Sequence, residues 1–224
     1  LRVADLGALA ALARRRGVKL VVDNTFLSPA LCRPLEHGAD VVIHSATKYL
    51  SGHGQILGGV ACGSREVIAP IARTVSRLGG AMSAFAAWTL LAGVKTLPLR
   101  MREHSANAAR LAILLAAHPA VATVHYPGLL THPGHAVARG LVGDGERFGG
   151  MLAFALRDPA GTGQFLNALR LPTLAVSLGE CGSLIWPVEG SDLIRLSVGI
   201  EDIADLEADF RQALSVLQSA VAAD

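Results

Sequence analysis

The stretch KLVVDNTFLSPALCRPLEHGADVVIHS, residues 19–45, decides the fold class. It holds two short segments, residues 19–23 and 39–45, whose apolar residues are continuous rather than alternating with polar ones. A helical turn at residues 33–37, closed by Gly38, is expected between them. A strand, a short crossover and a second strand of this kind are typical of a parallel sheet covered on both faces. The sequence therefore predicts an α/β protein.

Outward from this stretch, the two halves of the chain differ in character. In the first half we predict a helix, a third strand and three more helices, at residues 3–16, 56–62, 65–78, 83–91 and 96–118. In the second half we predict strands at residues 123–126, 151–157, 175–178 and 193–198, and helices at residues 135–141, 161–169 and 202–221. Because the second half lacks strict alternation, we expect an α+β unit there. The boundary is placed within the third helix, which gives domains at residues 1–98 and 99–224.

The composition is that of a globular protein with a large core. Of 224 residues, 51% are hydrophobic and 17% are charged, and 20 Lys and Arg stand against 18 Asp and Glu, a net charge of +2. These values exclude a disordered chain, and so small a charge argues against nucleic-acid binding. Two long uncharged stretches, residues 78–94 and 111–138, are interrupted by Gly and Pro, so we predict no membrane span.

The cysteines and histidines indicate neither disulfides nor a metal site. Cys32, Cys62 and Cys181 are odd in number, widely spaced and without a C-x-x-C pair, so we expect reduced thiols and a cytoplasmic location. His132 and His135 form an H-x-x-H pair, but no carboxylate follows nearby. We therefore predict no metal.

The densest chemical signal is VVIHSATKY, residues 41–49. A buried apolar strand ends at Ser45, and Thr47 and Lys48 follow at once. Open parallel sheets bind ligands at the carboxyl ends of their strands. An amine placed there can act as a nucleophile, and the neighbouring hydroxyls can donate hydrogen bonds to a phosphate. An exposed surface lysine after a strand is the alternative interpretation.

Two further charged residues lie in apolar strands. Asp23 ends the first predicted strand, where a carboxylate is unfavourable unless a cation pairs with it. Arg195 interrupts the last predicted strand, and arginine is suited to two-pronged capture of a carboxylate. A turn aspartate and an edge-strand arginine that reaches for solvent are the alternatives. Together, an amine, phosphate donors, an acid and a carboxylate clamp suit a pyridoxal phosphate enzyme that acts on an amino acid.

At this point the sequence resembles a known family, the pyridoxal phosphate enzymes of Cys/Met metabolism. The matching stretches include VVDNTFLSPALCRPLEHGADVVIHSATKYLSGHG, TLPLRMREHSANA and LIRLSVGIEDIADL, and the resemblance runs from about residue 2 to residue 217. The family includes cystathionine γ-lyase, cystathionine γ-synthase and methionine γ-lyase. The resemblance implies the aminotransferase-like (type I) fold, with residues 1–98 as the later part of the large cofactor-binding domain and residues 99–224 as the small C-terminal domain.

The resemblance also implies a role for each site residue. Lys48 would hold pyridoxal 5'-phosphate covalently and then move protons, and Asp23 would pair with the ring nitrogen of the cofactor. Ser45 and Thr47 would bind its phosphate. The substrate carboxylate would be bound by Arg195, with Ser177 close to that carboxylate and to the lysine. The family further implies a cytoplasmic homo-oligomer, a dimer of dimers, that takes a small amino acid as its substrate.

The sequence departs from the family pattern in three places. No leader peptide is visible, and the chain starts with Leu1, so we expect an N-terminal part that carries other phosphate-binding residues to be absent. The stretch at residues 180–187 runs almost directly into Leu193, where family members carry a longer loop, and this predicts a more open substrate pocket. Val176 stands where many cystathionine-handling members have glutamate, which favours a smaller or more apolar distal substrate group.

Three functions remain open from the sequence. The first is a lyase that cleaves a C–S bond of cystathionine, methionine or a related amino acid by γ-elimination. The second is γ-replacement by the same residues, as in a synthase or sulfhydrylase. The third is a truncated, non-catalytic chain that acts as an assembly partner, for which the intact mass of the expressed polypeptide would be decisive.

Overall fold

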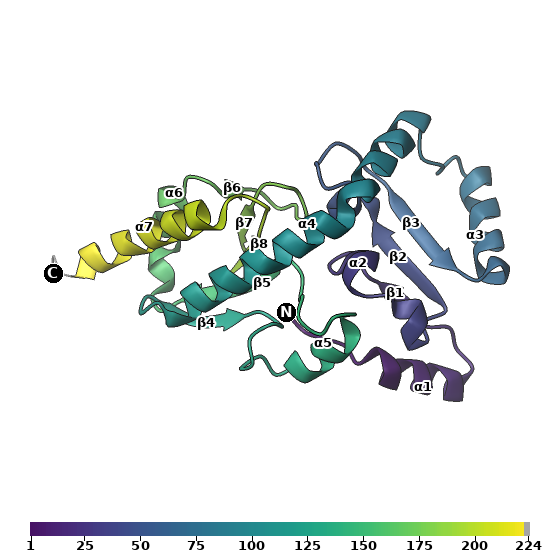
Figure 1. The fold of residues 1–224 in the computed structure, drawn as a ribbon, viewed down its shortest axis with the longest axis horizontal. Coiled ribbons are helices and arrows are strands. Elements are labelled where there is room, and N and C mark those ends of the chain that lie inside the picture. The colour runs from purple at the N-terminus through teal and green to yellow at the C-terminus, as the bar shows by residue number, and fades with distance from the viewer. Residues whose placement is uncertain (222–224) are drawn as a thin grey trace.

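The computed structural model describes residues 1–221 of the chain. Figure 1 shows two sheets that lie apart from each other and one long helix, α4 (Ala84–Ala117), that runs from the first sheet to the second. The three-stranded sheet is built by the first part of the chain and the five-stranded sheet by the part after α4. One helix thereby joins the two parts of the chain that carry the predicted site residues.

The first sheet has the order β1-β2-β3. The elements of this part of the chain are, in order, α1 (Leu6–Arg16), β1 (Val21–Asp23), α2 (Ser28–Leu31), a short turn of helix (Pro34–His37), β2 (Val41–Ser45), β3 (Gly59–Gly63) and α3 (Arg65–Arg77). Strands β1 and β2 pair in parallel, as predicted, and β3 pairs with β2 antiparallel. The prediction that both faces are covered is wrong for this chain, because Val21 and Ile43 share a face and are 54% and 39% exposed.

The second sheet has the order β4-β5-β8-β7-β6. Its strands are β4 (Val121–His125), β5 (Met151–Leu156), β6 (Thr173–Leu174), β7 (Leu184–Pro187) and β8 (Leu193–Ser197), and its helices are α5 (His135–Leu141), α6 (Thr162–Ala168) and α7 (Ile203–Val221). Leu111, Leu115, Phe154, Phe165 and Phe210 join α4, β5, α6 and α7 in one buried core. Apolar burial of this extent is the main stabilising contribution to the fold.

The two helices predicted at residues 83–91 and 96–118 are one helix, α4, which continues through Pro98. Proline removes one backbone hydrogen bond from a helix, but tertiary contacts hold this turn in place. The side chains of Thr96 and Arg100 donate to the carbonyl of Gly93, at 3.1 and 2.8 Å. Gly93 itself packs so closely on the backbone of Ser51 that a Cβ there would lie 2.3 Å from the Ser51 carbonyl oxygen.

The strand predicted at residues 175–178 is also wrong. The pairing ends at Leu174, and the carbonyl groups of Val176 and Ser177 accept hydrogen bonds from the Arg195 side chain instead of from a strand. Strand β7 was not predicted, because the stretch that contains it reads as a loop. The boundary predicted between residues 98 and 99 falls inside α4, and the division into two domains stays a prediction.

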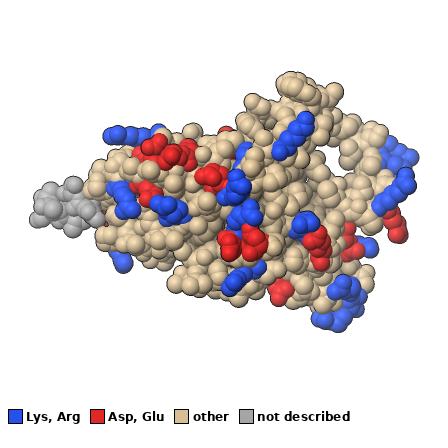
Figure 2. All heavy atoms as spheres, viewed as in Figure 1, with Lys and Arg blue, Asp and Glu red and all other residues tan. Residues whose placement is uncertain are grey.

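The surface is mixed in charge. Figure 2 shows basic and acidic side chains interspersed over both parts of the viewed face, in keeping with the small net charge. Among residues 1–221, no helix combines the length and the apolar character that crossing a membrane requires. In the same part of the chain, no group of three or more His, Cys, Asp or Glu side chains is placed to hold a metal ion.

Candidate active site

The parallel pairing of β1 and β2 brings the residues at their carboxyl ends together. Asp23 Oδ1 accepts hydrogen bonds from the backbone N–H of Thr25 at 2.9 Å and from its hydroxyl at 2.6 Å. The same Thr25 hydroxyl oxygen accepts from the N–H of Ser45, at 2.8 Å. Thr25 therefore ties the two strand ends together. The sequence analysis did not assign it to the site, although a threonine two residues after an aspartate is a known turn signal.

Lys48 lies in a single turn that follows β2. This turn spans Ala46–Leu50, and Lys48 departs from helical geometry within it, with φ −90° and ψ −132°. Its amine Nζ donates to the hydroxyl oxygen of Ser177, at 2.9 Å, across 129 residues of sequence. The structure therefore brings Lys48 and Ser177 together, as the resemblance implies.

Thr47 is placed differently from its neighbours. Its Oγ1 accepts from the N–H of Gly58 at 3.1 Å and lies 3.5 Å from the Gly58 carbonyl oxygen. Ser45 and Lys48 line a cavity, but Thr47 is not among the residues that line it. The side chain of Thr47 thus holds the chain at the start of β3, and its role toward a phosphate stays a prediction.

Arg195 lies on β8, the central strand of the five-stranded sheet, so the edge-strand alternative is wrong. Its Nη2 donates to the carbonyls of Val176 at 2.6 Å and Ser177 at 3.0 Å. Its Nε is buried and has no hydrogen-bond partner within residues 1–221. Burial lowers the pKa of the guanidinium. Arg195 therefore connects through Ser177 to Lys48, although neither Arg195 nor Ser177 is among the residues that line the cavity that Lys48 lines.

A cavity of about 550 Å³ lies between the two sheets. Its polar and charged lining is Arg2, Asp23, Asn24, Thr25, Cys32, Ser45 and Lys48, and the rest is apolar. Phe26 and Leu27 line it on the side of the first sheet, and Phe148, Gly149 and Met151 line it on the side of the second. The carboxylate, the hydroxyl and the amine thus share one largely apolar chamber.

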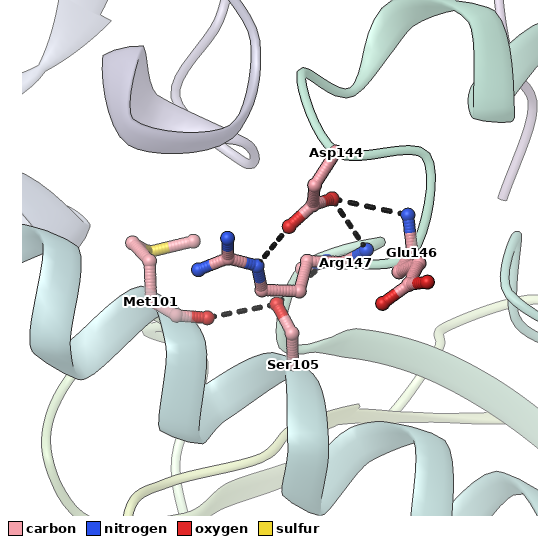
Figure 3. Close-up of polar contacts among 6 residues, drawn as sticks. Met101, Ser105, Asp144, Glu146 and Arg147 are labelled. Carbon is pink, nitrogen blue, oxygen red and sulfur yellow. Dashed lines mark hydrogen bonds and ion pairs between the residues drawn. The ribbon is translucent and has the colours of Figure 1, made fainter.

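The wall of this cavity next to α4 is held by hydrogen bonds. Ser105 Oγ donates to the Met101 carbonyl at 2.8 Å and accepts from the N–H of Gly149 at 3.1 Å. Figure 3 shows Ser105 on α4 and, beside it, the loop in which Asp144 accepts from the backbone N–H groups of Glu146 and Arg147 and from the Arg147 side chain. These contacts hold the loop that places Gly149 in the wall of the cavity.

One buried histidine near the site makes the stability of the protein dependent on pH. His104 on α4 is fully buried, its Nδ1 lies 2.7 Å from the Val198 carbonyl, and its Nε2 has no partner within the described residues. Burial lowers the pKa of His104 from 6.5 to about 4. Between these two values the unfolded chain binds a proton that the folded chain rejects, so the free energy of unfolding falls as the pH falls.

We therefore expect a loss on the order of 3 kcal/mol between pH 6.5 and pH 4 from this residue alone. Urea unfolding at pH 7.5 and 4.5, with wild type beside His104→Asn, measures it, because asparagine retains an N–H for the Val198 carbonyl but does not titrate. Equal acid sensitivity of the two proteins would contradict this assignment.

Comparison with known proteins places this geometry in context. Residues 1–189 match the model of one family, described as Cys/Met metabolism PLP-dependent enzyme. The chain is 44% identical to the L-methionine gamma-lyase of Pseudomonas putida and 42% identical to the cystathionine gamma-lyase of Bacillus subtilis; in both cases 96% of this chain is covered, with 58% and 60% of the relative. It is 45% identical to the cystathionine gamma-synthase of Mycobacterium tuberculosis, with 96% and 58% covered.

Solved structures agree with the sequence comparison. The cystathionine gamma synthase of Xanthomonas oryzae pv. oryzae, in complex with aminoacrylate and cysteine, matches with a TM-score of 0.94 and 40% identity over 98% of this chain and 61% of that one. A methionine gamma lyase of Micromonospora echinospora matches with a TM-score of 0.89 and 38% identity, over 96% and 59%. These matches confirm the predicted fold class. The chain spans about three fifths of the length of the proteins that it matches.

Proposed function

Because the chain belongs to the Cys/Met metabolism PLP-dependent enzyme family, whose cofactor is pyridoxal phosphate, we propose that the full-length protein is a carbon–sulfur lyase. It would eliminate the γ-substituent of a sulfur amino acid such as methionine or cystathionine. The observation that carries the proposal is the hydrogen bond from Lys48 Nζ to Ser177 Oγ at 2.9 Å. This bond joins the amine in the cavity to the segment that Arg195 holds.

The residues of the cavity fit pyridoxal phosphate. Asp23 has Oδ1 engaged by Thr25, whereas within residues 1–221 its Oδ2 has no hydrogen-bond partner and can pair with a cationic ring nitrogen. Lys48 offers a primary amine for an aldehyde, and Ser45 offers a hydroxyl. A carboxylate, an amine and a hydroxyl in one apolar chamber are the donor set that this cofactor requires.

The proposed roles follow from where the side chains lie. When bound, the cofactor supplies an electron sink for negative charge that develops on the substrate. Asp23 would keep the proton on the ring nitrogen. Lys48 would first hold the cofactor and then take the proton from the substrate Cα, with its Nζ oriented by Ser177. Arg195 would bind the substrate carboxylate through its guanidinium and so hold the Cα–H bond within reach of Lys48.

Two features support a preference for an apolar distal group. Val176 carries no charge, and its side chain is 64% exposed beside the carbonyl that Arg195 holds. Strand β7 leads through a tight turn, closed by the Val188 N–H to Leu193 carbonyl bond of 2.8 Å, directly into β8. With so short a connection, little covers this side of the site. A substrate whose distal group is a small thioether, as in methionine, therefore suits this side of the site better than a substrate with a second amino-acid group, as in cystathionine.

We also propose a homo-oligomer of the dimer-of-dimers type and a cytoplasmic location. The first has support in a row of exposed apolar side chains on α3 and the start of α4, where Phe85 is 71% and Trp88 is 68% exposed. The second has support in the cysteines, all three of which are unpaired. Sedimentation of the purified protein measures the first, and fractionation of the cells measures the second.

Elimination and replacement are separated by what the full-length protein releases. With methionine or cystathionine alone, we expect a 2-oxo acid and ammonia, because the γ-substituent leaves and the remaining fragment hydrolyses. With an activated homoserine plus cysteine or sulfide, a condensed product (the thioether with cysteine, the thiol with sulfide) would favour γ-replacement, the second candidate, which the resemblance to cystathionine gamma-synthases supports. A protein that holds the cofactor yet leaves every sulfur amino acid unchanged would contradict elimination, and one that also forms no condensed product from activated homoserine would contradict both.

A further inference from the structure

Arg100 on α4 is a buried cation without a carboxylate partner. Only 5% of its surface is exposed, and it has no ion-pair partner within residues 1–221. Burial lowers its pKa. An unpaired charge in such a place destabilises a fold relative to an apolar side chain of similar length. The reason for an arginine here must therefore lie in what its guanidinium holds.

The guanidinium holds the backbone that follows the lysine. Its Nη1 donates to the Tyr49 carbonyl at 2.8 Å, and its Nη2 lies 3.4 Å from the Leu50 carbonyl. These are the carbonyls one and two residues after Lys48, whose own backbone leaves helical geometry. Gly52 turns directly beneath the guanidinium with φ +73°, and a Cβ there would lie 2.2 Å from Nη1. Arg100 thus holds the C-terminal end of the turn that carries Lys48.

The same face of α4 carries two more buried polar side chains, at intervals of four and three residues. His104 Nδ1 lies 2.7 Å from the Val198 carbonyl. Asn107 Nδ2 donates to the Gly199 carbonyl at 3.2 Å and to the Glu201 carbonyl at 2.8 Å. These carbonyls follow the end of β8, the strand that carries Arg195.

One continuous helix, α4, therefore contacts both halves of the site. Figure 1 shows α4 passing from the first sheet to the second, and the distance along its axis from Arg100 to Asn107 is roughly 10 Å, at 1.5 Å per residue. The hydrogen bonds from these side chains to the lysine turn and to the end of β8 all go to backbone carbonyls, and His104 also packs edge-on against the Tyr49 ring, so the contacts set position rather than chemistry. Misplacement of reacting groups by about 1 Å can lower a rate about 100-fold.

We propose that the row Arg100, His104 and Asn107 on α4 sets the position of Lys48 relative to Arg195, with Arg100 as the positioning residue for the lysine turn. The inference rests on the proposed function, because that function assigns the chemistry to Lys48 and the substrate carboxylate to Arg195. None of the three side chains is a catalytic group, since each acts through the backbone that it holds.

The test compares Arg100→Met and Arg100→Lys with Arg102→Met, an exposed arginine on the same helix, in the full-length protein. For Arg100→Met we expect amide hydrogen exchange in residues 46–52 to speed up by about tenfold or more, with exchange in β4 and β5 unchanged. We expect kcat to fall by roughly 10- to 100-fold and KM to change by less than about threefold. Arg100→Lys should lie between, because an ammonium cannot reach the carbonyls of Tyr49, Leu50 and Gly93 together. Arg102→Met should match wild type.

Two results would overturn the inference: wild-type exchange in residues 46–52 in both Arg100 variants, or an equal rise in exchange throughout the protein, which a merely structural role predicts. If Arg100→Met does not fold, the same two criteria apply to Arg100→Lys. Failure of the proposed function looks different. In that case wild type itself would bind no cofactor and release no product, while the exchange of residues 46–52 would still report on the turn that Arg100 holds.

Discussion

Replacing Lys48 with alanine should lower the rate of 2-oxo acid release by about 10³-fold or more and remove the visible absorption of lysine-bound cofactor. The reason is geometric. Lys48 Nζ lies 2.9 Å from Ser177 Oγ, in a cavity that Asp23 and Ser45 also line. The visible spectrum of wild type and variant reports the bound cofactor, and the intact mass after borohydride measures the attachment, since reduction links the cofactor permanently to the polypeptide only where it is bonded to an amine.

Lys19→Ala is the matched control. The Lys19 side chain is 68% exposed, and its Nζ pairs with Asp40 Oδ1 at 2.9 Å. Neither of these two residues lines the cavity. We expect its spectrum and its rate to equal those of wild type, because an exposed ion pair contributes little to stability. If Lys48→Ala still gains the mass of the cofactor after borohydride, another amine carries the cofactor, and Lys95, the one remaining lysine, would be the first to test.

The part of the fold that the sequence predicts well is the part set by local rules. The continuous apolar segments predict β1 and β2 and their parallel pairing, and Gly17 ends α1 in the left-handed conformation, with φ 63°, that favours glycine. The failures come from tertiary contacts. Local rules end a helix near Pro98, but Gly93 against Ser51 and the side-chain donors of Arg100 keep α4 continuous.

The candidate site divides in the same way. The rule that ligands bind at the carboxyl ends of parallel strands brings Asp23, Ser45 and Lys48 together from the sequence alone. The contact between Lys48 and Ser177 spans 129 residues, and only the resemblance to a family indicated it. Arg100 went unassigned because it binds backbone carbonyls, which every residue possesses. A side chain that recognises backbone leaves no pattern of partner residues in the sequence.

Arg195→Met should raise KM for the amino-acid substrate by about 10- to 100-fold while leaving the absorption of the bound cofactor unchanged. Hydrogen bonds to a charged group contribute about 1.5–3 kcal/mol each, and a two-pronged contact to the substrate carboxylate would be lost. Within residues 1–221 the Arg195 side chain has no carboxylate partner, so its charge is available to a substrate carboxylate. Steady-state kinetics with Arg110→Met as control measure the effect, since Arg110 is 59% exposed and pairs with Glu207 on the helix surface.

The same variant separates two roles for Arg195. Its Nη2 already holds the carbonyls of Val176 and Ser177, so the residue also fixes the segment that orients Lys48. If holding this segment is its whole contribution, Arg195→Met will displace the Ser177 hydroxyl, and kcat will fall while KM stays near that of wild type. If Arg195 binds the substrate, KM must rise, because the carboxylate then loses the guanidinium that holds it. An unchanged KM in a folded variant would therefore assign the carboxylate to a different residue and leave Arg195 as a support for Ser177.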